Sequence, residues 1–470
     1  MVGDFLKNTY LLFHLQKDAF CGAGVAAQLR NSGFCSRNMQ KEKSLAAIGG
    51  RNYMTFVEFF EKDALENLCS CLTVAPDKII LIGDNRKVMQ SHADRYERLL
   101  RARREVVDFE IISVDKNNIY SILHVLEKIV TEEDECAFDL TGGEDIYLVA
   151  MGIVFERHKD KKPQMHRFNI RNNTVFDCDL DGTNIASQPA PEIGIEELIY
   201  AYGGEVVYED EYEHGTHEWT WSDEFYNQIL QMWEICRKDV RLWNLQVGML
   251  ELIEVFNNDP EGNLTTMVPV AYLEDYLKSQ GRDFFANRRI LRDLVSAGLI
   301  TLYEQTDDTI TVSYCDFQVK RCLTKAGQIL ELAVCTAAKK ATEPDGSNTY
   351  HDVMTGVTID WDGVICVDES AYDTANEIDV IMVRGMVPVF VSCKNGNVDS
   401  GELYKLNTVA ERFGGKYAKK VLIATALDPE DIAAQYLCQR AEDMKINIIT
   451  SFQSLDLEGI NKLVRSLWKQ

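Results

Sequence analysis

The stretch NEIDVIMVRGMVPVFVSCKNG, residues 376–396, contains two apolar segments that meet at Gly385. Both segments are rich in Val and Ile, and we interpret them as the two strands of a β-hairpin. Because side chains alternate along a strand, Glu377 and Asp379 are expected on the same face of the first strand. The residues expected to point the other way, into the core, are Ile378, Val380 and Met382.

A four-residue loop at 384–387 would fix the register of this hairpin. In that register Asp379 lies opposite Ser392, and Glu377 lies opposite Lys394. All four side chains then share one face of the hairpin. A shift by one residue would move one strand's side chains to the opposite face, so this expectation depends on the register.

The three charged residues suit the chemistry of a metal-dependent nuclease of the restriction-endonuclease type. Phosphodiester hydrolysis needs Mg²⁺ or Mn²⁺ held by hard oxygen ligands, and the metal lowers the pKa of a bound water. A lysine beside the metal orients the water and offsets the developing charge. We therefore predict Asp379 and the Cys393 carbonyl oxygen as metal ligands and Lys394 as the catalytic cation.

The alternative interpretation is structural. Glu377 and Lys394 would form a buried ion pair, with Asp379 capping a neighbouring element. Buried ion pairs are weak sources of stability, so this alternative gives little reason to place three charges here. We favour the nuclease interpretation.

The composition limits the classes of function. A chain of 470 residues is expected to form two to four domains, and its net charge of -25 argues against nucleic-acid binding over a broad surface. Any contact with nucleic acid is therefore expected in a local cleft. The 13 cysteines include no C-x-x-C pair, and no apolar run is long enough to cross a membrane. We expect reduced thiols, no secretory signal, no membrane contact and a cytoplasmic location.

The first part of the chain alternates strand-like and helix-like segments, which predicts a doubly wound, mostly parallel sheet. The expected strands are residues 9–15, 78–83, 106–114 and 136–140. A hairpin through Asn172 and Asn173 is expected to follow them.

The stretch DLTGGEDIYLVAMG, residues 139–152, has the pattern of a strand, a Gly-Gly turn and a helix. Ligands of open α/β sheets bind beyond the carboxyl ends of the strands, and a Gly-Gly turn lets backbone amides approach a phosphate or a ribose. The two glycines can equally serve only to make the turn. The residues alone leave both interpretations open.

The middle of the chain begins with an acidic segment at 205–224, where His214 and His217 have H-x-x-H spacing. We favour a solvated connector over a metal site there. A helix within 284–300, followed by a hairpin that turns at Asp307 and Asp308, predicts a winged helix. Its helix carries Arg288, Arg289 and Arg292, but the acidic hairpin tip repels phosphate, so a spacer is favoured over a DNA-binding module.

The last part begins with a helix at about 325–340, and strands and helices then follow in an order that predicts an α/β domain with a mixed sheet. Residues 376–396, the segment ELYKLNTVAERFGGKYAKKVLI that follows, and TKAGQILE (324–331) closely resemble the nuclease domain of CRISPR ancillary nucleases that carry a CARF sensor domain. The resemblance covers about residues 323–470. It implies a restriction-endonuclease-like fold and metal-dependent cutting of DNA, RNA or both.

The resemblance also assigns site residues. It implies that Glu331, Asp379 and Lys394 are catalytic, with Glu331 a further metal ligand. Some family members have a glutamate at the position of Ser392, and a serine lacks that charge. We expect a carboxylate from elsewhere to replace it, and the candidates are Glu331, Glu377 or Glu402.

The stretch DLTGGEDIYLVAMG resembles the strand-TGG-helix motif of CARF domains, which bind cyclic oligoadenylates at a homodimer interface. This resemblance covers about residues 8–204, and the family's frequent lysine two residues after the second glycine is Asp145 here. The implied ligand positions are Thr141, Gly142, Gly143 and Glu144, with Gln16 and Asn85 in loops after two expected strands.

These observations lead to one functional hypothesis with two alternatives. We expect residues 1–204 to be a Rossmann-like CARF sensor, 205–322 an acidic connector and winged-helix-like domain, and 323–470 the nuclease domain. The whole would be a homodimeric nuclease of type III CRISPR antiviral defence that is activated by a cyclic oligoadenylate, with cyclic tetra-adenylate as first choice. The alternatives are a ligand-responsive transcriptional regulator with an inactive nuclease domain, and a protein that degrades its own activator.

Overall fold

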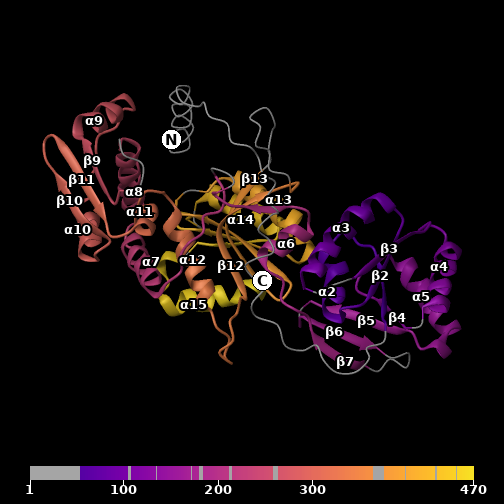
Figure 1. Cartoon of the computed structure of the whole chain (residues 1–470). Helices are drawn as coiled ribbons and strands as arrows, with labels where there is room; N and C mark the ends of the chain where they lie inside the picture. The colour runs from indigo at the N-terminus through magenta and orange to yellow at the C-terminus, as the bar shows by residue number, and fades with distance from the viewer. Residues whose placement is uncertain are drawn as a thin grey trace, which may run out of the picture. The chain divides into compact units, whose positions relative to one another are not determined.

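The protein has a mixed α/β fold, shown as a computed structural model in Figure 1. The structure describes residues 53–103, 107–133, 135–170, 172–178, 184–210, 214–257, 263–363, 375–396, 398–428, 431–450 and 452–469. The strand expected at 9–15 and the candidate ligand residue Gln16 lie outside the described residues. Within the described ranges the strands form three sheets.

The first sheet has the strand order β3-β2-β1-β4-β5-β6-β7. Its strands are β1 (Thr55–Phe59), β2 (Lys78–Gly83), β3 (Asp108–Ser113), β4 (Cys136–Asp139), β5 (Gln164–Asn169), β6 (Thr174–Cys178) and β7 (Asn184–Pro189). The first five pair in parallel, and β6 and β7 are added antiparallel. The strand order reverses between β1 and β4, which makes this the position where a doubly wound sheet binds ligands.

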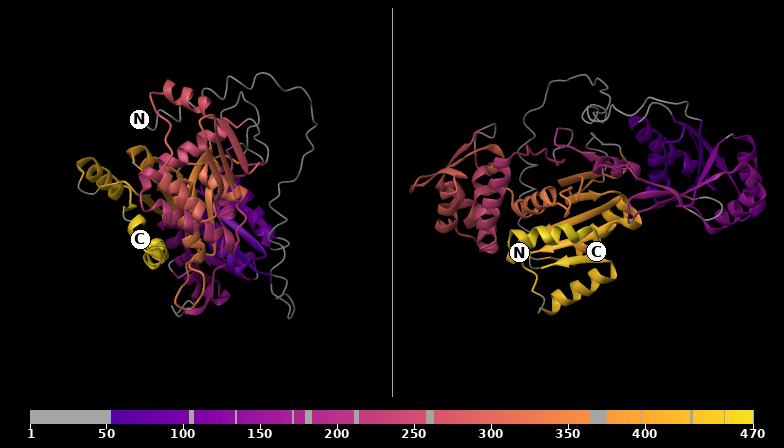
Figure 2. Two further views of the ribbon diagram at one scale, coloured as in Figure 1. Left: turned by 90° about the vertical axis from the view of Figure 1, so that its left-hand side faces the viewer. Right: turned by 90° about the horizontal axis from the view of Figure 1, so that it is seen from below.

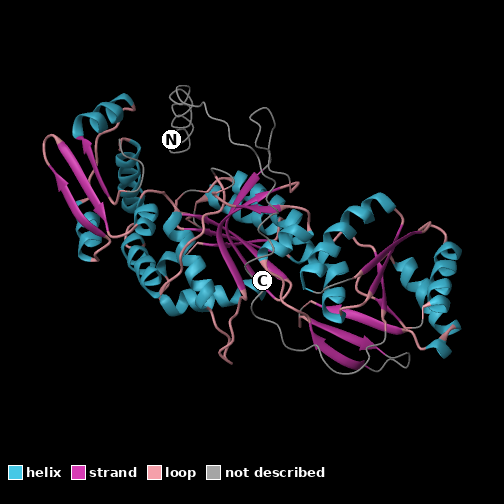
Figure 3. Ribbon diagram, in the orientation of Figure 1, coloured by secondary structure: helices cyan, strands magenta, loops and turns pink. Residues whose placement is uncertain are grey.

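Helices cover both faces of this sheet (Figure 3). They are α2 (Ala64–Val74), α3 (Arg86–Arg103), α4 (Ile119–Glu132) and α5 (Asp145–Arg157). Val57 and Ile80 pack with buried residues of α4 and α5, whereas Phe56 and Ile79 pack with those of α2 and α3. Successive residues of a strand therefore enter opposite cores, as a doubly wound sheet requires.

The three strands expected at 78–83, 106–114 and 136–140 are confirmed as β2, β3 and β4. The central strand β1 was not expected from the sequence. Its sequence, TFVEF, includes Glu58, which interrupts the apolar run. Glu58 is nevertheless buried, and burial together with the charge of Asp139 raises its pKa well above the usual range. The Cys71 thiol donates to its carboxyl group. A neutral carboxyl group with a hydrogen-bond partner can be buried in a core, but the sequence alone does not show that Glu58 is neutral.

The middle part contains a small sheet of order β10-β11-β9 beside several helices. Its elements are α7 (Asp223–Cys236), α8 (Val240–Val255), β9 (Thr265–Pro269), α9 (Val270–Ser279), α10 (Arg288–Ser296), β10 (Ile300–Gln305), β11 (Thr309–Tyr314) and α11 (Phe317–Leu323). The predicted helix and hairpin are confirmed, since Gln305 pairs with Ile310 across a turn that contains Asp307 and Asp308.

The third sheet has the order β16-β15-β14-β13-β12-β8. Its strands are β8 (Glu205–Val207), β12 (Asp352–Asp360), β13 (Ala375–Arg384), β14 (Val387–Lys394), β15 (Lys419–Ala424) and β16 (Ile446–Ile449). The sheet is mixed, as predicted, because β14, β15 and β16 are parallel and the other pairs are antiparallel. Strand β8 comes from the segment expected to be a solvated connector, and it pairs with β12 instead.

Helices also lie on both faces of the third sheet, as Figure 2 shows for its yellow C-terminal strands. They include α6 (Ile195–Ala201), α12 (Gln328–Lys340), α13 (Ser400–Gly414), α14 (Ile432–Asp443) and α15 (Leu457–Ser466). Buried residues of α12 and α15 pack with Val380 and Val391, and those of α13 pack with Ile381 and Phe390. None of the helices in the described ranges combines the length and the hydropathy needed to span a bilayer.

Candidate active site and candidate ligand site

The hairpin β13–β14 has the register predicted from its sequence. Val383 pairs with Pro388 and Val380 pairs with Val391. The ladder extends to Arg384 and Val387, so the connection is a two-residue turn within the expected loop. Gly385 opens this turn with φ 59°, a backbone conformation that glycine adopts without a steric penalty.

Asp379 is held at the end of this ladder by β14. Its Oδ2 atom accepts a hydrogen bond of 2.5 Å from the backbone N–H of Cys393 and one of 3.2 Å from the hydroxyl of Ser392. Ser392 thus lies opposite Asp379 as predicted, and its side chain fixes the carboxylate that it faces. The carbonyl of Cys393 stays a prediction as a metal ligand, because the contact seen for Cys393 is through its amide.

The strand is irregular at Asp379, which corrects the predicted alternation. Ile378 packs in the cluster of α13, whereas Val380 packs in the cluster of α12, so the two do not share one core. The adjacent strand β12 has Gly356 at φ 58° in the corresponding position, and the Thr355 hydroxyl donates to the backbone carbonyl of Asp379. We attribute the change of face to this local break in the β12–β13 ladder.

Lys394 lies between two carboxylates from different elements. Its Nζ atom is 4.0 Å from Oδ2 of Asp379 and 3.0 Å from Oε2 of Glu402, which is in the first turn of α13. Burial lowers the pKa of Lys394, but the two carboxylates more than offset this and raise it. Lys394 therefore stays positively charged, which suits a cation that stabilises charge better than a general base.

Glu331 is the buried member of the group. It lies in the first turn of α12, its exposed fraction is 8%, and Nε2 of Gln328 donates to its carboxyl group at 3.0 Å. Burial and the nearby charge of Asp379 raise the pKa of Glu331 to about 8. Two carboxyl groups that oppose each other's ionisation are suited to share a cation.

Glu377 lies at the edge of this site. Its side chain is 42% exposed, and its Oε1 atom is 3.6 Å from Nζ of Lys325. The alternative ion pair between Glu377 and Lys394 is therefore wrong, because Lys394 binds Glu402. A direct role for Glu377 in catalysis stays a prediction.

The residues present fit a small divalent cation with few protein ligands. Among the described residues, no three His, Cys, Asp or Glu side chains are close enough to hold a metal by themselves. Mg²⁺ and Mn²⁺ in phosphoryl-transfer sites are commonly held by one or two carboxylates, with waters and substrate oxygens as the other ligands. Glu331 and Asp379 supply two such carboxylates. Burial is the main cause of the raised pKa of each, and a second carboxylate nearby adds to it, Asp379 for Glu331 and Glu377 for Asp379.

The Gly-Gly turn lies at the switch point of the first sheet. Gly143 has φ 98°, and a Cβ atom there would come within 2.6 Å of Cβ of Phe59, so this position requires glycine. Its backbone N–H donates to Oε1 of Glu61, in the loop after β1. The amide that a ligand phosphate would use is thus bound by a carboxylate of the protein.

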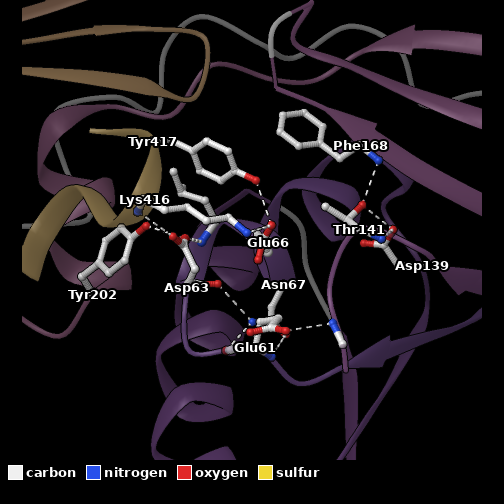
Figure 4. Close-up of polar contacts among 12 residues, drawn as sticks. Glu61, Asp63, Glu66, Asn67, Asp139, Thr141, Phe168, Tyr202, Lys416 and Tyr417 are labelled. Carbon is white, nitrogen blue, oxygen red and sulfur yellow. Dashed lines mark hydrogen bonds and ion pairs between the residues drawn. The ribbon is translucent and has the colours of Figure 1, made fainter. Parts of the chain in front are cut away.

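The hydroxyl of Thr141 is engaged within the fold. It donates to Asp139 at 2.6 Å and accepts from the backbone N–H of Phe168 at 2.8 Å, which connects β4 to β5 (Figure 4). Burial raises the pKa of Asp139 to about 6, and the hydrogen bonds from Thr141 act against this shift. The side chain of Thr141 therefore supports the turn, and a role in ligand contact stays a prediction.

We expect Thr141→Val to destabilise the fold by about 1–3 kcal/mol, because it removes the donor to a buried carboxyl and the acceptor of a backbone amide. Denaturant unfolding compared with wild type measures this change. Thr131→Val is the matched control, since the Thr131 hydroxyl bonds only to the carbonyl of Glu127 on an exposed helix face. Equal stability of the two variants would contradict this role for Thr141.

Other polar residues lie at the same edge of the sheet. Nζ of Lys116, after β3, is 3.0 Å from Asp84 and 3.1 Å from Glu144. An open depression of about 610 Å³ is lined by Lys116, Asn117, Glu144, Asp145 and Ile146. Asn85 follows β2 and caps α3, where its side chain accepts from the N–H of Val88.

Sequence reasoning missed Glu61 and Lys116. Lys116 follows an expected strand directly, so its position beyond a carboxyl end was available as a signal. Glu61 follows β1, which was not expected, so nothing in the sequence placed Glu61 beside the Gly-Gly turn.

Two solved structures are similar to this chain in fold. Protein VC1899 from Vibrio cholerae is similar with a TM-score of 0.65 and 17% identity, over 89% of this chain and 98% of that chain. Can2 from Sulfobacillus thermosulfidooxidans, solved in complex with cyclic tetra-adenylate, is similar with a TM-score of 0.57 and 14% identity, over 88% of this chain and 98% of that chain. Both likenesses show a shared α/β fold.

A type III CRISPR defence DNA nuclease activated by cyclic oligoadenylate is similar with a TM-score of 0.43 and 14% identity, over 84% of this chain and 52% of that chain. No protein-family model and no curated protein matches the chain.

Proposed function

We propose that the protein is a cyclic-oligoadenylate-activated, metal-dependent nuclease of type III CRISPR antiviral defence. The observation that carries the proposal is the gathering of Glu331, Asp379 and Lys394 from α12, β13 and β14 into one charged group. The fold shared with Can2, which was solved with cyclic tetra-adenylate, supports the choice of activator. Residues 1–204 would sense the ligand, 205–322 would connect, and 323–470 would cut.

The residues of the active site would divide the work between binding and charge stabilisation. Glu331 and Asp379 would hold Mn²⁺ or Mg²⁺, which when bound lowers the pKa of a water molecule and stabilises negative charge on the phosphate. The N–H of Cys393 and the hydroxyl of Ser392 orient Asp379. Lys394, with its charge maintained, would orient the attacking water and offset charge on the scissile phosphate.

Glu402 would be a positioning residue in this scheme. It binds Nζ of Lys394 at 3.0 Å and so fixes the direction of a long, flexible side chain. Glu402 and Glu331 also bring two carboxyl groups from α13 and α12 to the hairpin, whose own carboxylates are Asp379 and, at the edge of the site, Glu377. We propose that Glu402 and Glu331 replace the family's missing glutamate.

The candidate ligand site would accept a ring of adenylates at the carboxyl edge of the first sheet. The groups there that would attract phosphate are the turn at Gly142 and Gly143, the N-terminus of α5 and the cation Lys116. Three carboxylates, Glu61, Glu144 and Asp145, lie beside them and would have to be displaced or balanced by the ligand. Two copies of the site related by a twofold axis would hold one ring, which requires a homodimer. Cyclic tetra-adenylate has the symmetry for this arrangement.

A cleavage assay tests the proposal. Labelled DNA and RNA, each single- and double-stranded, are incubated with the full chain and Mn²⁺, with and without cyclic tetra-adenylate. We expect cleavage of at least one polymer, stimulated about tenfold or more by the ring. Consumption of the ring without cleavage of any polymer would instead support the protein that degrades its activator.

The regulator alternative has less support in the structure. The winged-helix-like part carries Arg288, Arg289 and Arg292 on α10, but its hairpin turns at Asp307 and Asp308. A regulator would bind a DNA sequence whether or not metal is chelated, and this binding would be lost in Arg288→Ala. A gel-shift experiment with EDTA distinguishes it from the nuclease.

A further inference from the structure

Residues 61–67, which we call the connecting segment, link the Gly-Gly turn to the C-terminal end of helix α13. This segment follows β1 and includes the N-terminal turn of α2. It contacts the turn at one end and residues 415–417 at the other (Figure 4). Each contact is a hydrogen bond or an ion pair, so the path can be tested one bond at a time.

The first contact is between Glu61 and the turn. Oε1 of Glu61 accepts the N–H of Gly143 at 3.1 Å, and a Cβ atom at Gly142 would lie 2.9 Å from Cγ of Glu61. The glutamate side chain therefore lies against both glycines. An anionic ligand that binds this amide has to displace the carboxylate, because one N–H donates one good hydrogen bond and two anions repel each other.

The second contact fixes Glu61 to the start of α2. The backbone N–H of Glu61 donates to Oδ1 of Asn67, and Nδ2 of Asn67 donates to the carbonyls of Glu61 at 2.7 Å and Asp63 at 3.2 Å. Asn67 is buried. This side chain holds both ends of the loop together, so a displacement of Glu61 disturbs the position of Asp63.

The third contact reaches the C-terminal part of the chain. One carboxylate oxygen of Asp63 accepts the hydroxyl of Tyr202 at 2.6 Å, and the other accepts the backbone N–H of Lys416 at 3.0 Å. Glu66 accepts the hydroxyl of Tyr417 at 2.8 Å and pairs with Nζ of Lys416 at 2.5 Å. Two acids of the connecting segment therefore hold residues 415–417.

Residues 415–417 follow directly on α13, and α13 begins in the candidate active site. The helix runs from Ser400 to Gly414, and its first turn holds Glu402, the partner of Lys394. An α-helix of this length is a stiff element of about 20 Å. A change at its C-terminal end is therefore expected to shift or rotate its first turn.

We propose that Glu61 occupies the Gly-Gly turn in the absence of ligand, and that its displacement by an adenylate phosphate is passed through Asp63 and Glu66 to α13 and so to Lys394. This inference rests on the proposed function and adds the route of its regulation. The ligand changes the balance between the two arrangements only by the free energy with which it prefers the displaced one. Glu61 thus lowers the affinity for the ligand and, at the same time, couples ligand binding to the position of α13.

The near end of the route is tested with Glu61→Gln in the full chain, using labelled cyclic tetra-adenylate as the probe. The neutral side chain can keep the hydrogen bond to Gly143 but competes less well with phosphate, so we expect the ring to bind about tenfold more tightly. Glu274→Gln, which alters an ion pair with Lys278 on the distant helix α9, is the control and should bind the ring as wild type does. Unchanged affinity in Glu61→Gln would overturn the displacement step.

The far end is tested with the double variant Asp63→Asn/Glu66→Leu. Asparagine keeps one acceptor oxygen for the helix cap on α2, whereas Asp63 accepts from three donors, namely the N–H of Leu65, the hydroxyl of Tyr202 and the N–H of Lys416. We expect ring affinity within about twofold of wild type, whereas stimulation of cleavage falls about tenfold or more. Full stimulation in this variant would overturn the route.

A ligand-free measurement separates failure of the route from failure of the proposed function. Hydrogen exchange at the N–H of Lys416 is followed in wild type and in Glu61→Ala, without any nucleotide. If the segment transmits the loss of Glu61, this amide exchanges about tenfold faster, and the amide of Ala433, capped by Asp431 on α14, is unchanged. Equal exchange at Lys416 would refute the connection even if the ring activates cleavage, and faster exchange in a protein that never cuts would refute only the nuclease assignment.

Discussion

Asp379→Asn is expected to lower ring-stimulated cleavage by about 10² to 10³-fold, the size of effect seen when a group that stabilises transition-state charge is removed. The carboxylate of Asp379 would be a metal ligand, and an amide oxygen is a much weaker one. The asparagine oxygen can still accept the N–H of Cys393, so the hairpin is expected to fold normally. Initial rates on the DNA or RNA substrate with Mn²⁺ measure the effect.

A matched control comes from the same region of the fold. Glu411 is on α13, its side chain is 63% exposed, and it pairs with Lys420, away from Lys394. Glu411→Gln removes a carboxylate from the same helix that carries Glu402. It is expected to cut at the wild-type rate, because Lys420 keeps its hydrogen bond to Asn407 and neither residue contacts Asp379 or Lys394. An Asp379→Asn protein that melts like wild type and also cuts like wild type would refute the proposed metal site.

The hairpin at the active site shows how much a sequence can predict. The pairing of Val383 with Pro388 and the placement of Ser392 beside Asp379 were both available from the alternation and from the glycine turn. Register is strongly determined where a strand has apolar residues to bury, because a shift by one residue exposes all of them. The buried Val and Ile residues of this hairpin provide that constraint.

Alternation alone did not predict the break at Asp379 or the partner of Lys394. The break depends on Gly356 of β12, a strand whose alignment with β13 has no local signal in the sequence. Lys394 was expected opposite Glu377, but a long side chain reaches several neighbours, and Glu402 on α13 provides the closer carboxylate. Strand geometry predicts which face a residue occupies, whereas the choice of ion-pair partner depends on tertiary packing.

The candidate ligand site was harder to predict from the sequence than the candidate active site. The turn itself was recognisable from its two glycines, and Gly143 does adopt the positive φ that such a turn requires. Its neighbour Glu61 follows the strand β1, which contains the buried acid Glu58. A strand pattern read from apolar residues alone misses a buried carboxyl group, which becomes acceptable in a core only when it is neutral and has a partner.

The affinity for Mn²⁺ is expected to rise steeply with pH, because Glu331 must lose a proton to bind the metal. Its usual pKa is near 4.5, and in the folded protein burial and the charge of Asp379 raise it to about 8. Below this value the metal has to release a proton from Glu331, so affinity should increase about tenfold for each pH unit between pH 6 and pH 8 and level off above. Calorimetric titration of the wild-type protein with Mn²⁺ across this range measures both the affinity and the protons released.

The same shift fixes the sign of the effect on stability, which gives an independent check. An acid whose pKa is raised by folding stabilises the folded state at low pH, and this contribution is lost as the pH rises from about 4.5 towards 8. Without metal, Glu331→Gln should therefore melt like wild type near pH 5 and at a higher temperature near pH 9, where its neutral side chain avoids the cost of a buried charge. The variant should bind Mn²⁺ more weakly at pH 8 and with a much flatter pH dependence. A wild-type titration that releases no protons near pH 6.5, or a variant with an unaltered pH dependence, would show that Glu331 does not bind the metal.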